Sequence, residues 1–498
     1  MPLRARIFLW EREILAEEKV DVEGLFRARP SVREILERLS RAGHDVALVG
    51  GIVRDALLAQ LEGRAFAPQD VDLATAALPH QVKGLFPDWH IVEVGESFGV
   101  LQLLAPDGRE YEVATYRREG EYDGRWPGEV EPAASLEEDL KRRDLTINGL
   151  AARGDGRVID IVGGISDLKK RIVRTIGDPE KRFSEDYLRM LRAIRCACLI
   201  DGRLTAEVSR AIERNGAKLL LISWERIREE LFKILLTPRA AWGIELLDDH
   251  GLLAFLLPEL VATKGVSQPE KYHPEGDVYT HTLLALEVAD RLGFEPLVKF
   301  AVLLHDLGKP AALARNRGEH MGGHELIGEE LAERVSRRFR LSNDQIKVVK
   351  YLVREHLRIA KLPEMARTRQ IRFIQQAGVG EALQADFTDL GRKFPLFAKL
   401  LRLLIADCEA SVHRSSGWLP VLQTFVGLLP QLKRLEELEA AQKLLDGQDV
   451  LDLGVAEGPL VGQILGEVYD EIFSGKIQSR EEALELAREL VQKQGIVK

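Results

Sequence analysis

Segments with the alternating pattern of β-strands are confined to the first third of the chain, and this limits the possible fold more than any other feature. From Asp167 onward such segments nearly vanish and apolar residues recur at helical spacing, as in Ala240–Leu257 and Leu283–Leu292. The strand-like runs are Val46–Val49, Val71–Ala74, Val100–Leu104, Tyr111–Tyr116 and Val158–Val162. The pattern predicts a small domain of strands and helices followed by helical domains.

Length and composition indicate a multidomain globular protein. A chain of 498 residues is too long for one hydrophobic core, which predicts three or four domains. The three cysteines lack zinc-finger spacing and indicate a reducing compartment. Met1–Glu13 lacks the apolar core of a signal peptide, and no apolar run approaches the length of a membrane span, so we expect a cytoplasmic protein that does not bind membranes.

Two aspartates, Asp70 and Asp72, follow the segment Val49–Asp55, which reads Val-Gly-Gly-Ile-Val-Arg-Asp. Residues two apart in an extended strand point to the same side, so both carboxylates can meet at one metal site. The glycine pair allows a phosphate to approach the backbone closely, and the arginine after it can neutralise that phosphate. Taken alone, the two acids also fit an ordinary strand end exposed to solvent. The segments that follow favour a metal site.

Three later segments add groups suited to nucleotidyl transfer. Glu110 and Glu112 share one face of a strand, and either can supply a third carboxylate; Glu112 is our first choice. In Lys141–Leu150, clustered positive charge precedes an aspartate and an asparagine, which suits a triphosphate and a sugar hydroxyl. The segment Arg182–Arg195 is predicted to be one amphipathic helix, with Asp186, Arg189 and Arg192 roughly on one polar face.

In order and spacing, these motifs resemble the bacterial-type (class II) tRNA nucleotidyltransferases and poly(A) polymerases. The motifs are Gly50-Gly51-x-x-Arg54-Asp55, Asp70-x-Asp72, Arg142-Arg143-Asp144-x-Thr146-x-Asn148, Glu185-Asp186-x-x-Arg189 and Glu225–Leu231. The resemblance covers about residues 28–236, and the tail beyond Leu445 resembles some members more weakly. Leu145 stands where the family usually has Phe, and Gly149 where Ala is common. The resemblance implies an α+β fold with a polymerase-β-like head, built on a small mixed sheet, and an all-α neck.

The resemblance also implies roles for individual residues. Asp70 and Asp72, with Glu112, are the expected catalytic carboxylates and hold Mg²⁺. The expected nucleotide-binding residues are Gly50, Gly51, Arg54, Arg143, Asp144, Asn148, Asp186, Arg189 and Arg192. Asp186 and Arg189 are expected to read the incoming base, because cytosine and adenine both present an amino donor beside a ring-nitrogen acceptor. Guanine and uracil reverse both polarities, so a buried carboxylate and guanidinium would reject them.

The polar loop Tyr116–Pro127 resembles the flexible loop that goes with the final A addition in this family. It favours full CCA addition, or A addition alone, over CC-only activity.

Between Lys169 and Arg195 there are nine Lys and Arg residues against four Asp and Glu, although the whole chain has a net charge of −9. Such a basic stripe suits a polyanion held in one groove, and a solvated helix face is the competing interpretation.

The second half of the chain has the residues of a different metal site. Seven of the eleven histidines fall between His273 and His413. His281, His305, Asp306, His324, His356 and Asp407 follow one another in the order of the HD phosphohydrolase superfamily, which they resemble. We prefer His324 to His320 because His-Glu-x-x-Gly fits that pattern better. Neutral imidazoles and carboxylates suit Mn²⁺, Ni²⁺, Fe²⁺ or Mg²⁺, and such a site can activate water against a phosphate ester.

These observations predict a CCA-adding tRNA nucleotidyltransferase that binds the tRNA acceptor arm and uses CTP and ATP. The expected domains are a catalytic head at 28–165, a helical neck and body at 166–262, an HD-type helical domain at 270–413 and a helical tail at 418–498. The alternatives are an A-adding enzyme that works with a separate CC-adding partner, a poly(A) polymerase, an HD phosphohydrolase as the main activity, and an RNA-binding scaffold. The surviving carboxylates argue against a head that only binds.

Overall fold

A computed structural model describes residues 18–493, apart from 67–69, 94–98, 120–121, 124–125, 128–129, 134, 271–272, 377–393, 412–415 and 474–475. The expectations for Met1–Glu13, for the central part of the loop Tyr116–Pro127 and for the end of the HD-type domain near His413 lie outside the described residues. The chain divides into two compact units, Met1–Arg354 with Glu409–Arg414 and Glu355–Cys408 with Ser415–Lys498. Each unit is described by itself.

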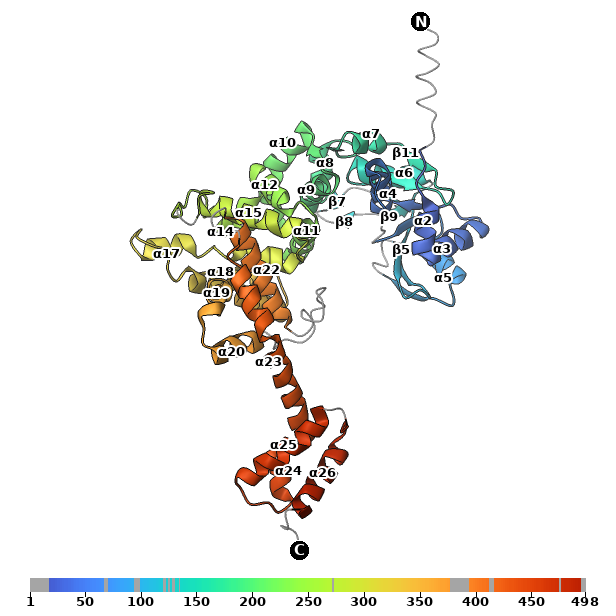
Figure 1. The fold of residues 1–498 in the computed structure, drawn as a ribbon. Coiled ribbons are helices and arrows are strands. Elements are labelled where there is room, and N and C mark those ends of the chain that lie inside the picture. The colour runs from blue at the N-terminus through green and yellow to red at the C-terminus, as the bar shows by residue number, and fades with distance from the viewer. Residues whose placement is uncertain are drawn as a thin grey trace, which may run out of the picture. The chain divides into compact units, whose positions relative to one another are not determined.

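The head contains a seven-stranded mixed sheet in the order β11-β10-β1-β2-β5-β4-β3 (Figure 1). Only β2 and β5 pair in parallel within it. Its strands are β1 (Val46–Val49), β2 (Asp72–Thr75), β3 (His90–Glu93), β4 (Val100–Leu104), β5 (Glu110–Thr115), β10 (Leu150–Ala152) and β11 (Val158–Asp160). Four of the five predicted strands lie within one residue of these bounds, and the fifth ends two residues early. The predicted mixed sheet is confirmed.

Helices cover the sheet on both faces. On one face Ala47, Val49 and Ala74 form a buried cluster with Leu136 and Leu140. Successive strand residues point to opposite faces, so the neighbouring buried residues of β1 face the helices that pack on it from the other side. The head helices are α2 (Val22–Ala28), α3 (Pro30–Arg41), α4 (Gly51–Glu62), α5 (Pro79–Leu85), α6 (Leu136–Lys141), η2 (Thr146–Asn148) and α7 (Gly164–Lys169). The short pairs are β6 (Arg117–Glu119) with β9 (Val130–Pro132), and β7 (Tyr122–Asp123) with β8 (Trp126–Pro127).

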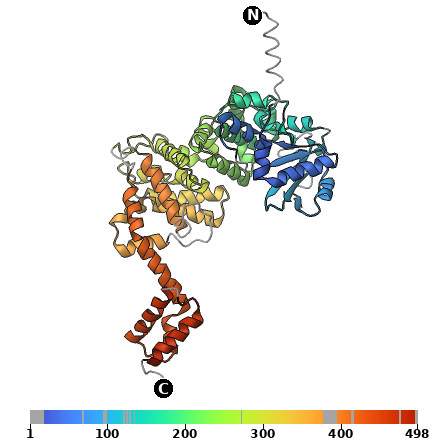
Figure 2. The same ribbon diagram turned by 45° about the vertical axis from the view of Figure 1, so that its right-hand side comes forward.

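In the part after the head that the structure describes, the regular elements are helices, as predicted, apart from one short parallel pair, β12 (Ile172–Val173) with β13 (Arg203–Leu204). The neck and body comprise α8 (Pro179–Glu185), α9 (Leu188–Ile200), α10 (Ala206–Asn215), η3 (Gly216–Leu221), α11 (Trp224–Leu236), α12 (Ala240–Asp249), α13 (Leu253–Leu256) and α14 (Pro258–Val261). The following helices are α15 (Val278–Arg291), α16 (Pro296–Leu304), α17 (Lys309–Arg315), α18 (His324–Arg338) and α19 (Asn343–Ile359). Figure 2 shows these helices, in green and yellow, after the blue head.

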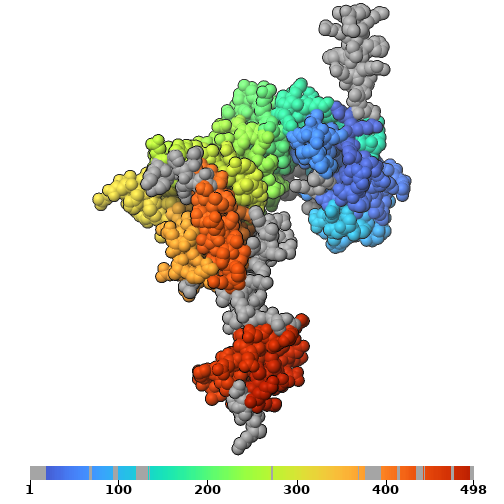
Figure 3. Space-filling view, viewed as in Figure 1, coloured from blue at the N-terminus to red at the C-terminus, as the bar shows by residue number. Residues whose placement is uncertain are grey.

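The second unit holds η4 (Leu362–Glu364), α20 (Arg367–Gln376), α22 (Pro395–Glu409), α23 (Leu419–Leu444), α24 (Gly447–Asp452), α25 (Pro459–Phe473) and α26 (Arg480–Lys493). Its last helices have a core of their own that includes Val450, Val468 and Val491. Figure 3 shows these tail helices, in red, as a single body. None of the helices that the structure describes is both long and apolar enough to cross a bilayer.

Candidate active site in the head and metal centre in the helical domain

Three carboxylates approach one another at the parallel pair of strands. The register sets Asp72 of β2 directly opposite Glu112 of β5. Asp70 precedes β2 and is exposed. Glu110, two residues before Glu112 on β5, accepts a 2.5 Å hydrogen bond from Gln102 Nε2. The register therefore favours Glu112 over Glu110 as the partner of Asp72.

The negative charge gathered at β2 and β5 changes the pKa of Asp72. Burial raises it first, and the carboxylates of Glu112 and Asp70 raise it further, to about 6, against the lowering effect of Arg143 and Arg192. Carboxylate oxygens in such a cluster are the ligands that Mg²⁺ prefers, so this donor set fits a divalent cation. Bound there, the cation would offset the mutual repulsion of the carboxylates.

Gly50 lets Arg143 lie against the backbone at the start of α4. Its φ is +75°, a conformation that favours glycine, and a Cβ there would lie 3.1 Å from Arg143 Nη1. Asp139 holds the arginine from the other side, since Arg143 Nη2 donates to Asp139 Oδ2 at 3.2 Å. Arg142 also donates to Asp139, through Nε at 2.9 Å and Nη2 at 2.8 Å. Asp139 was not singled out from the sequence, although it orients both arginines of the Arg-Arg-Asp motif.

The buried Asp139 stays ionised because of its partners. Burial alone would raise its pKa, but the guanidinium groups of Arg142 and Arg143 and the backbone N–H of Arg117 lower it below its usual value. A charged Asp139 holds both arginines in place, and Arg143 is the one whose charge acts on Asp72 of β2. Glycine at position 51 begins α4 beside this group.

A chain of hydrogen bonds joins two of the predicted motifs of the head to α9. Arg54 Nη1 donates to Asn148 Oδ1 at 2.7 Å, and Asn148 Nδ2 donates to Asp144 Oδ1 at 3.1 Å. Arg192 Nε then donates to Asp144 Oδ2 at 2.6 Å. Burial opposes ionisation of Asp144, but the charges of Arg192 and Arg189 and the hydrogen bonds lower its pKa well below the usual range. Arg54 and Asn148 are buried in this network, and their direct contact with a nucleotide stays a prediction.

The expected single helix over Arg182–Arg195 is wrong. The chain forms two helices, α8 and α9, and Asp186 between them has extended backbone with φ −156° and ψ 108°. Asp186 Oδ1 accepts a 3.1 Å hydrogen bond from the backbone N–H of Leu188, as a capping aspartate does. Its side chain therefore competes with the helical backbone and breaks the helix. Arg189 and Arg192 therefore lie on α9, whereas Asp186 lies in the break before it.

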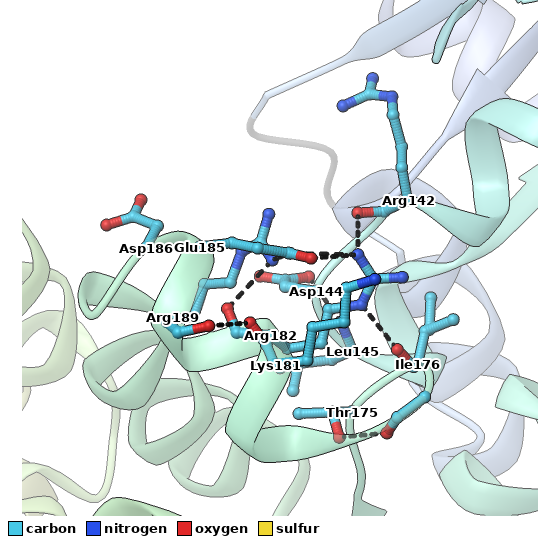
Figure 4. A network of polar contacts seen from close by, with 12 residues as sticks. Arg142, Asp144, Leu145, Thr175, Ile176, Lys181, Arg182, Glu185, Asp186 and Arg189 are labelled. Carbon is cyan, nitrogen blue, oxygen red and sulfur yellow. Dashed lines mark hydrogen bonds and ion pairs between the residues drawn. The ribbon is translucent and has the colours of Figure 1, made fainter. Parts of the chain in front are cut away.

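Asp186 and Arg189 each have a protein partner. Arg226 of α11 donates to both oxygens of Asp186, at 3.2 and 2.6 Å. Arg189 donates to Glu185 and, at 3.1 Å, to the carbonyl of Arg182. Figure 4 shows the Asp186 carboxylate directed away from the network that contains Glu185, Arg189 and Asp144. Arg226 lies forty residues from Asp186, and its only sequence signal was its place in the motif Glu225–Leu231.

The basic stretch between Lys169 and Arg195 is not one exposed stripe. Most of its positive side chains form ion pairs within the chain, which places their charge opposite carboxylates. The pairs are Lys169–Glu18, Arg171–Glu62, Arg174–Asp167, Arg182–Glu185, Arg189–Glu185, Arg192–Asp144 and Arg195–Glu230. These arginines connect head, neck and α11, and composition alone could not distinguish that use from binding of a polyanion.

A second group of ligand-type residues lies among the helices of the first unit. His281 on α15, His305 and Asp306 after α16, and His324 at the start of α18 are all buried. Asp306 Oδ2 lies 3.2 Å from His305 Nε2, and its Oδ1 lies 3.2 Å from His324 Nε2. Burial opposes ionisation of Asp306, but His305, Lys309 and His324 hold its pKa well below the usual value. His320 lies in an exposed turn.

This donor set of imidazoles and a carboxylate fits a divalent cation. Two further groups adjoin it, because Glu275 Oε1 lies 2.6 Å from His281 Nδ1 and 2.9 Å from His273 Nδ1. Burial would raise the pKa of Glu275, but these imidazoles and the backbone lower it to about 2. His356 and Asp407 are buried in the second unit, and their participation in the site stays a prediction.

Three known protein families match successive segments of the chain. Residues 46–174 match the poly A polymerase head domain, and residues 203–263 match the probable RNA and SrmB-binding site of polymerase A. Residues 278–379 match the HD domain.

Curated relatives are similar over slightly less than half of the chain. A CCA-adding enzyme of Anoxybacillus flavithermus is 43% identical over 231 residues, which are 46% of this chain and 56% of the relative. A CCA-adding enzyme of Geobacillus stearothermophilus is 42% identical over 223 residues, 45% of this chain and 53% of the relative. The chain spans about half the length of the curated relatives that it matches.

Solved structures share the fold. The Bacillus stearothermophilus CCA-adding enzyme in complex with CTP superposes with a TM-score of 0.56 at 26% identity, covering 94% of this chain and 98% of the other. A Thermotoga maritima CCA-adding enzyme complexed with tRNA-CCA gives a TM-score of 0.50 at 19% identity, covering 96% and 99%. Three segments of the chain thus match, in the order that the motifs predicted, a poly A polymerase head domain, a probable RNA and SrmB-binding site of polymerase A and an HD domain.

Proposed function

We propose that this protein is a CCA-adding tRNA nucleotidyltransferase. The observation that carries the proposal is the register that sets Asp72 opposite Glu112, with Arg143 held beside them by Asp139. The relatives named as CCA-adding enzymes support the same activity over the matched half of the chain. In the reaction, the terminal ribose hydroxyl of tRNA attacks the α-phosphate of CTP or ATP, and pyrophosphate leaves. We expect this to take place in the cytoplasm.

Each residue of the head has a proposed part in this reaction. Asp70, Asp72 and Glu112 would hold Mg²⁺, which supplies charge stabilisation at the attacking and leaving oxygens when it is bound. Arg143 would neutralise the triphosphate, and Gly50 and Gly51 let the phosphates approach the backbone at the start of α4. Asp144 and Asn148 hold Arg192 and Arg54 in place around this group.

Asp186 and Arg189 are the proposed readers of the base. An ionised Asp186 can accept only, which suits the amino group that cytosine and adenine share. Arg226 orients this carboxylate because its guanidinium donates to both of its oxygens. Glu185 likewise orients Arg189, whose guanidinium is a donor only. Asp186 lies in the break between α8 and α9 and Arg189 lies in the first turn of α9, so the extended backbone at Asp186 sets how the two side chains lie relative to each other.

The direct test is single-nucleotide extension of a tRNA transcript that lacks its CCA end. With Mg²⁺ and one triphosphate at a time, we expect incorporation of C from CTP, and of A from ATP once CC is present, but not of G or U. A transcript of equal length without the acceptor arm is the matched control and should not be extended. Equal incorporation of all four nucleotides would contradict the proposed roles of Asp186 and Arg189.

The alternative activities predict other products in the same assay. A single A added only to the CC-ended transcript would indicate an A-adding enzyme with a separate CC-adding partner. Long A tails on any RNA would indicate a poly(A) polymerase. The HD domain favours the tRNA enzymes, because poly(A) polymerases of this type generally lack it.

We further propose that the HD domain binds a divalent transition metal or Mg²⁺ and hydrolyses a phosphate ester as a second activity. The observation that favours it is the approach of His305 Nε2 and His324 Nε2 to the two oxygens of Asp306. His281, His356 and Asp407 are the other proposed ligands. The metal would supply an activated water when bound. Hydrolysis of a nucleoside 2′,3′-cyclic phosphate by the Asp70→Ala/Asp72→Ala variant, lost on further His305→Ala/Asp306→Ala substitution, would test it.

A further inference from the structure

Three of the proposed ligand histidines of the HD domain, His281, His305 and His324, share one feature that bears on their use as ligands. His305 Nδ1 lies 2.7 Å from the carbonyl of Val302, and His324 Nδ1 lies 3.0 Å from the carbonyl of Met321. A carbonyl oxygen only accepts hydrogen bonds, so both Nδ1 atoms carry the proton. In a neutral imidazole this leaves the lone pair on Nε2, the atom that faces Asp306 in both residues.

His281 follows the same rule with a side chain in place of a carbonyl. Its Nδ1 lies 2.6 Å from Glu275 Oε1, and an ionised carboxylate is also an acceptor only. The His281 ring centre is 5.7 Å from that of His305, and ligand-type atoms of His281, His305 and Asp306 all lie within 4.8 Å of one another. Of the three partners, Glu275 alone can be changed by substitution.

The position of Glu275 is fixed by the loop that carries it. Asp277, two residues on, caps α15 by accepting from the backbone N–H of Thr280 at 2.8 Å, and it also accepts from Gly265 at 2.5 Å. The Glu275 side chain is only 4% exposed, and its Oε2 is buried without a hydrogen-bond partner among the described residues. A buried carboxylate oxygen without a hydrogen-bond partner lowers the stability of the fold, so the orientation of Glu275 calls for a functional explanation.

We propose that Glu275 is a positioning residue of the HD centre, which fixes His281 in the Nδ1–H tautomer and so directs its Nε2 lone pair to a divalent cation. The inference rests on the proposed function of this centre as a cation site. Glu275 precedes the residues that match the HD domain, which begin at residue 278. His273 donates to the same carboxylate oxygen at 2.9 Å, so Glu275 orients two neighbouring imidazoles whose centres are 4.7 Å apart. Outer carboxylates of this kind orient a metal-bound histidine and raise its basicity.

The first test needs no metal. In the full chain with ¹⁵N-labelled histidine, long-range proton–nitrogen spectra report which ring nitrogen of His281 is protonated. We expect Nδ1–H in the wild type and a shift toward Nε2–H in Glu275→Ala. Glu275→Gln should keep Nδ1–H, because the amide oxygen still accepts. An unchanged tautomer in Glu275→Ala would overturn the inference.

The second test measures Co²⁺ affinity by visible absorption in the Asp70→Ala/Asp72→Ala background, which removes the head carboxylates as competing ligands. We expect Glu275→Ala to weaken binding about 10- to 100-fold, as loss of an outer carboxylate does, and Glu275→Gln to weaken it less. Glu287→Ala, exposed on the same helix as His281, is the matched control and should bind as the parent does.

The outcomes separate the inference from the proposed cation site. If the parent binds Co²⁺ and His281→Ala weakens binding, but Glu275→Ala does not, the cation site stands and the role of Glu275 is wrong. If the parent does not bind Co²⁺, or His281→Ala binds as tightly as Glu287→Ala, the cation site itself is wrong and the inference fails with it.

Discussion

The head and the HD domain build candidate metal sites of opposite electrostatic character. In the head, Asp70, Asp72 and Glu112 place like charges together, and the pKa of Asp72 rises to about 6. In the HD domain, Asp306 lies among His305, His324 and Lys309, and its pKa falls well below the usual value. The comparison teaches that the head keeps an excess of negative charge for a cation and substrate to offset, whereas in the HD domain Lys309 Nζ lies 2.5 Å from Asp306 and offsets the charge of that carboxylate.

The largest expected effect is on nucleotide addition. Asp72→Asn removes a proposed cation ligand, and we expect the rate of C addition to fall at least about 1,000-fold, since such metals supply several kcal/mol of charge stabilisation. Asp306→Asn, the matched change in the HD domain, should leave the addition rate within about twofold. Single-turnover extension of a tRNA transcript measures both. Similar losses in the two variants would mean that the centres do not act separately.

The next prediction separates the two glutamates of β5. Glu112→Gln should slow C addition about 100-fold, because Glu112 faces Asp72, and Glu110→Gln should slow it less than about threefold, because Glu110 is paired with Gln102. The same extension assay compares them. A greater loss in Glu110→Gln than in Glu112→Gln would reverse the assignment of the third carboxylate.

Base selection should depend on Arg226 although it lies on α11. In Arg226→Ala the Asp186 carboxylate loses its bidentate partner, and we expect selectivity for C over U to fall about tenfold, the effect of roughly one lost charged hydrogen bond. Arg228→Ala, on the same helix, is the control, because Arg228 donates to the carbonyl of Arg340 instead. Competition between CTP and UTP gives the ratio. Unchanged selectivity in Arg226→Ala would show that Asp186 is oriented by other groups.

The smallest predicted effect is on stability and has opposite signs in the two sites. Because folding raises the pKa of Asp72, its carboxyl favours the folded state most when protonated, and that contribution is lost as pH rises through about 6. Without divalent cations, Asp72→Asn should therefore raise the melting temperature at pH 8, with a gain that shrinks below pH 6.

Asp306 has the reverse sign. Its lowered pKa stabilises the fold at all pH values above the ordinary carboxyl range and loses this only as pH falls through the lowered value. Asp306→Asn should therefore lower the melting temperature at pH 8. Calorimetry of metal-free protein at pH 5 and pH 8 measures both variants. The same sign in both sites at pH 8 would contradict the electrostatic comparison.

The sequence predicted the parts of each site that short motifs encode. The alternating pattern predicted the bounds of the strands that carry Asp72 and Glu112 to within one residue. The adjacent His305-Asp306 pair indicated the HD centre. The family models match the two domains that contain these residues, and the roles of the residues stay predictions.

Groups whose role depends on the contacts that they make in the fold could not be found from the motifs. Arg226 reaches Asp186 across forty residues, and nothing in the sequence shows the contact. The break at Asp186 was missed because helical periodicity continues through it. The Asp186 side chain accepts a hydrogen bond from the backbone N–H of Leu188, at the start of the second helix, and this local contact separates α8 from α9. Asp139 and Glu275 looked like ordinary acids until their partners were known.

The most direct test of the central claim is 3′-end sequencing of tRNA transcripts that end at the discriminator base, after C and after CC. Each is incubated with the protein, Mg²⁺ and all four nucleoside triphosphates. The account predicts that all three transcripts finish with CCA, and that Asp70→Ala/Asp72→Ala extends none of them. Failure of the wild-type protein to extend any transcript, or extension that ignores the identity of the nucleotide, would contradict it.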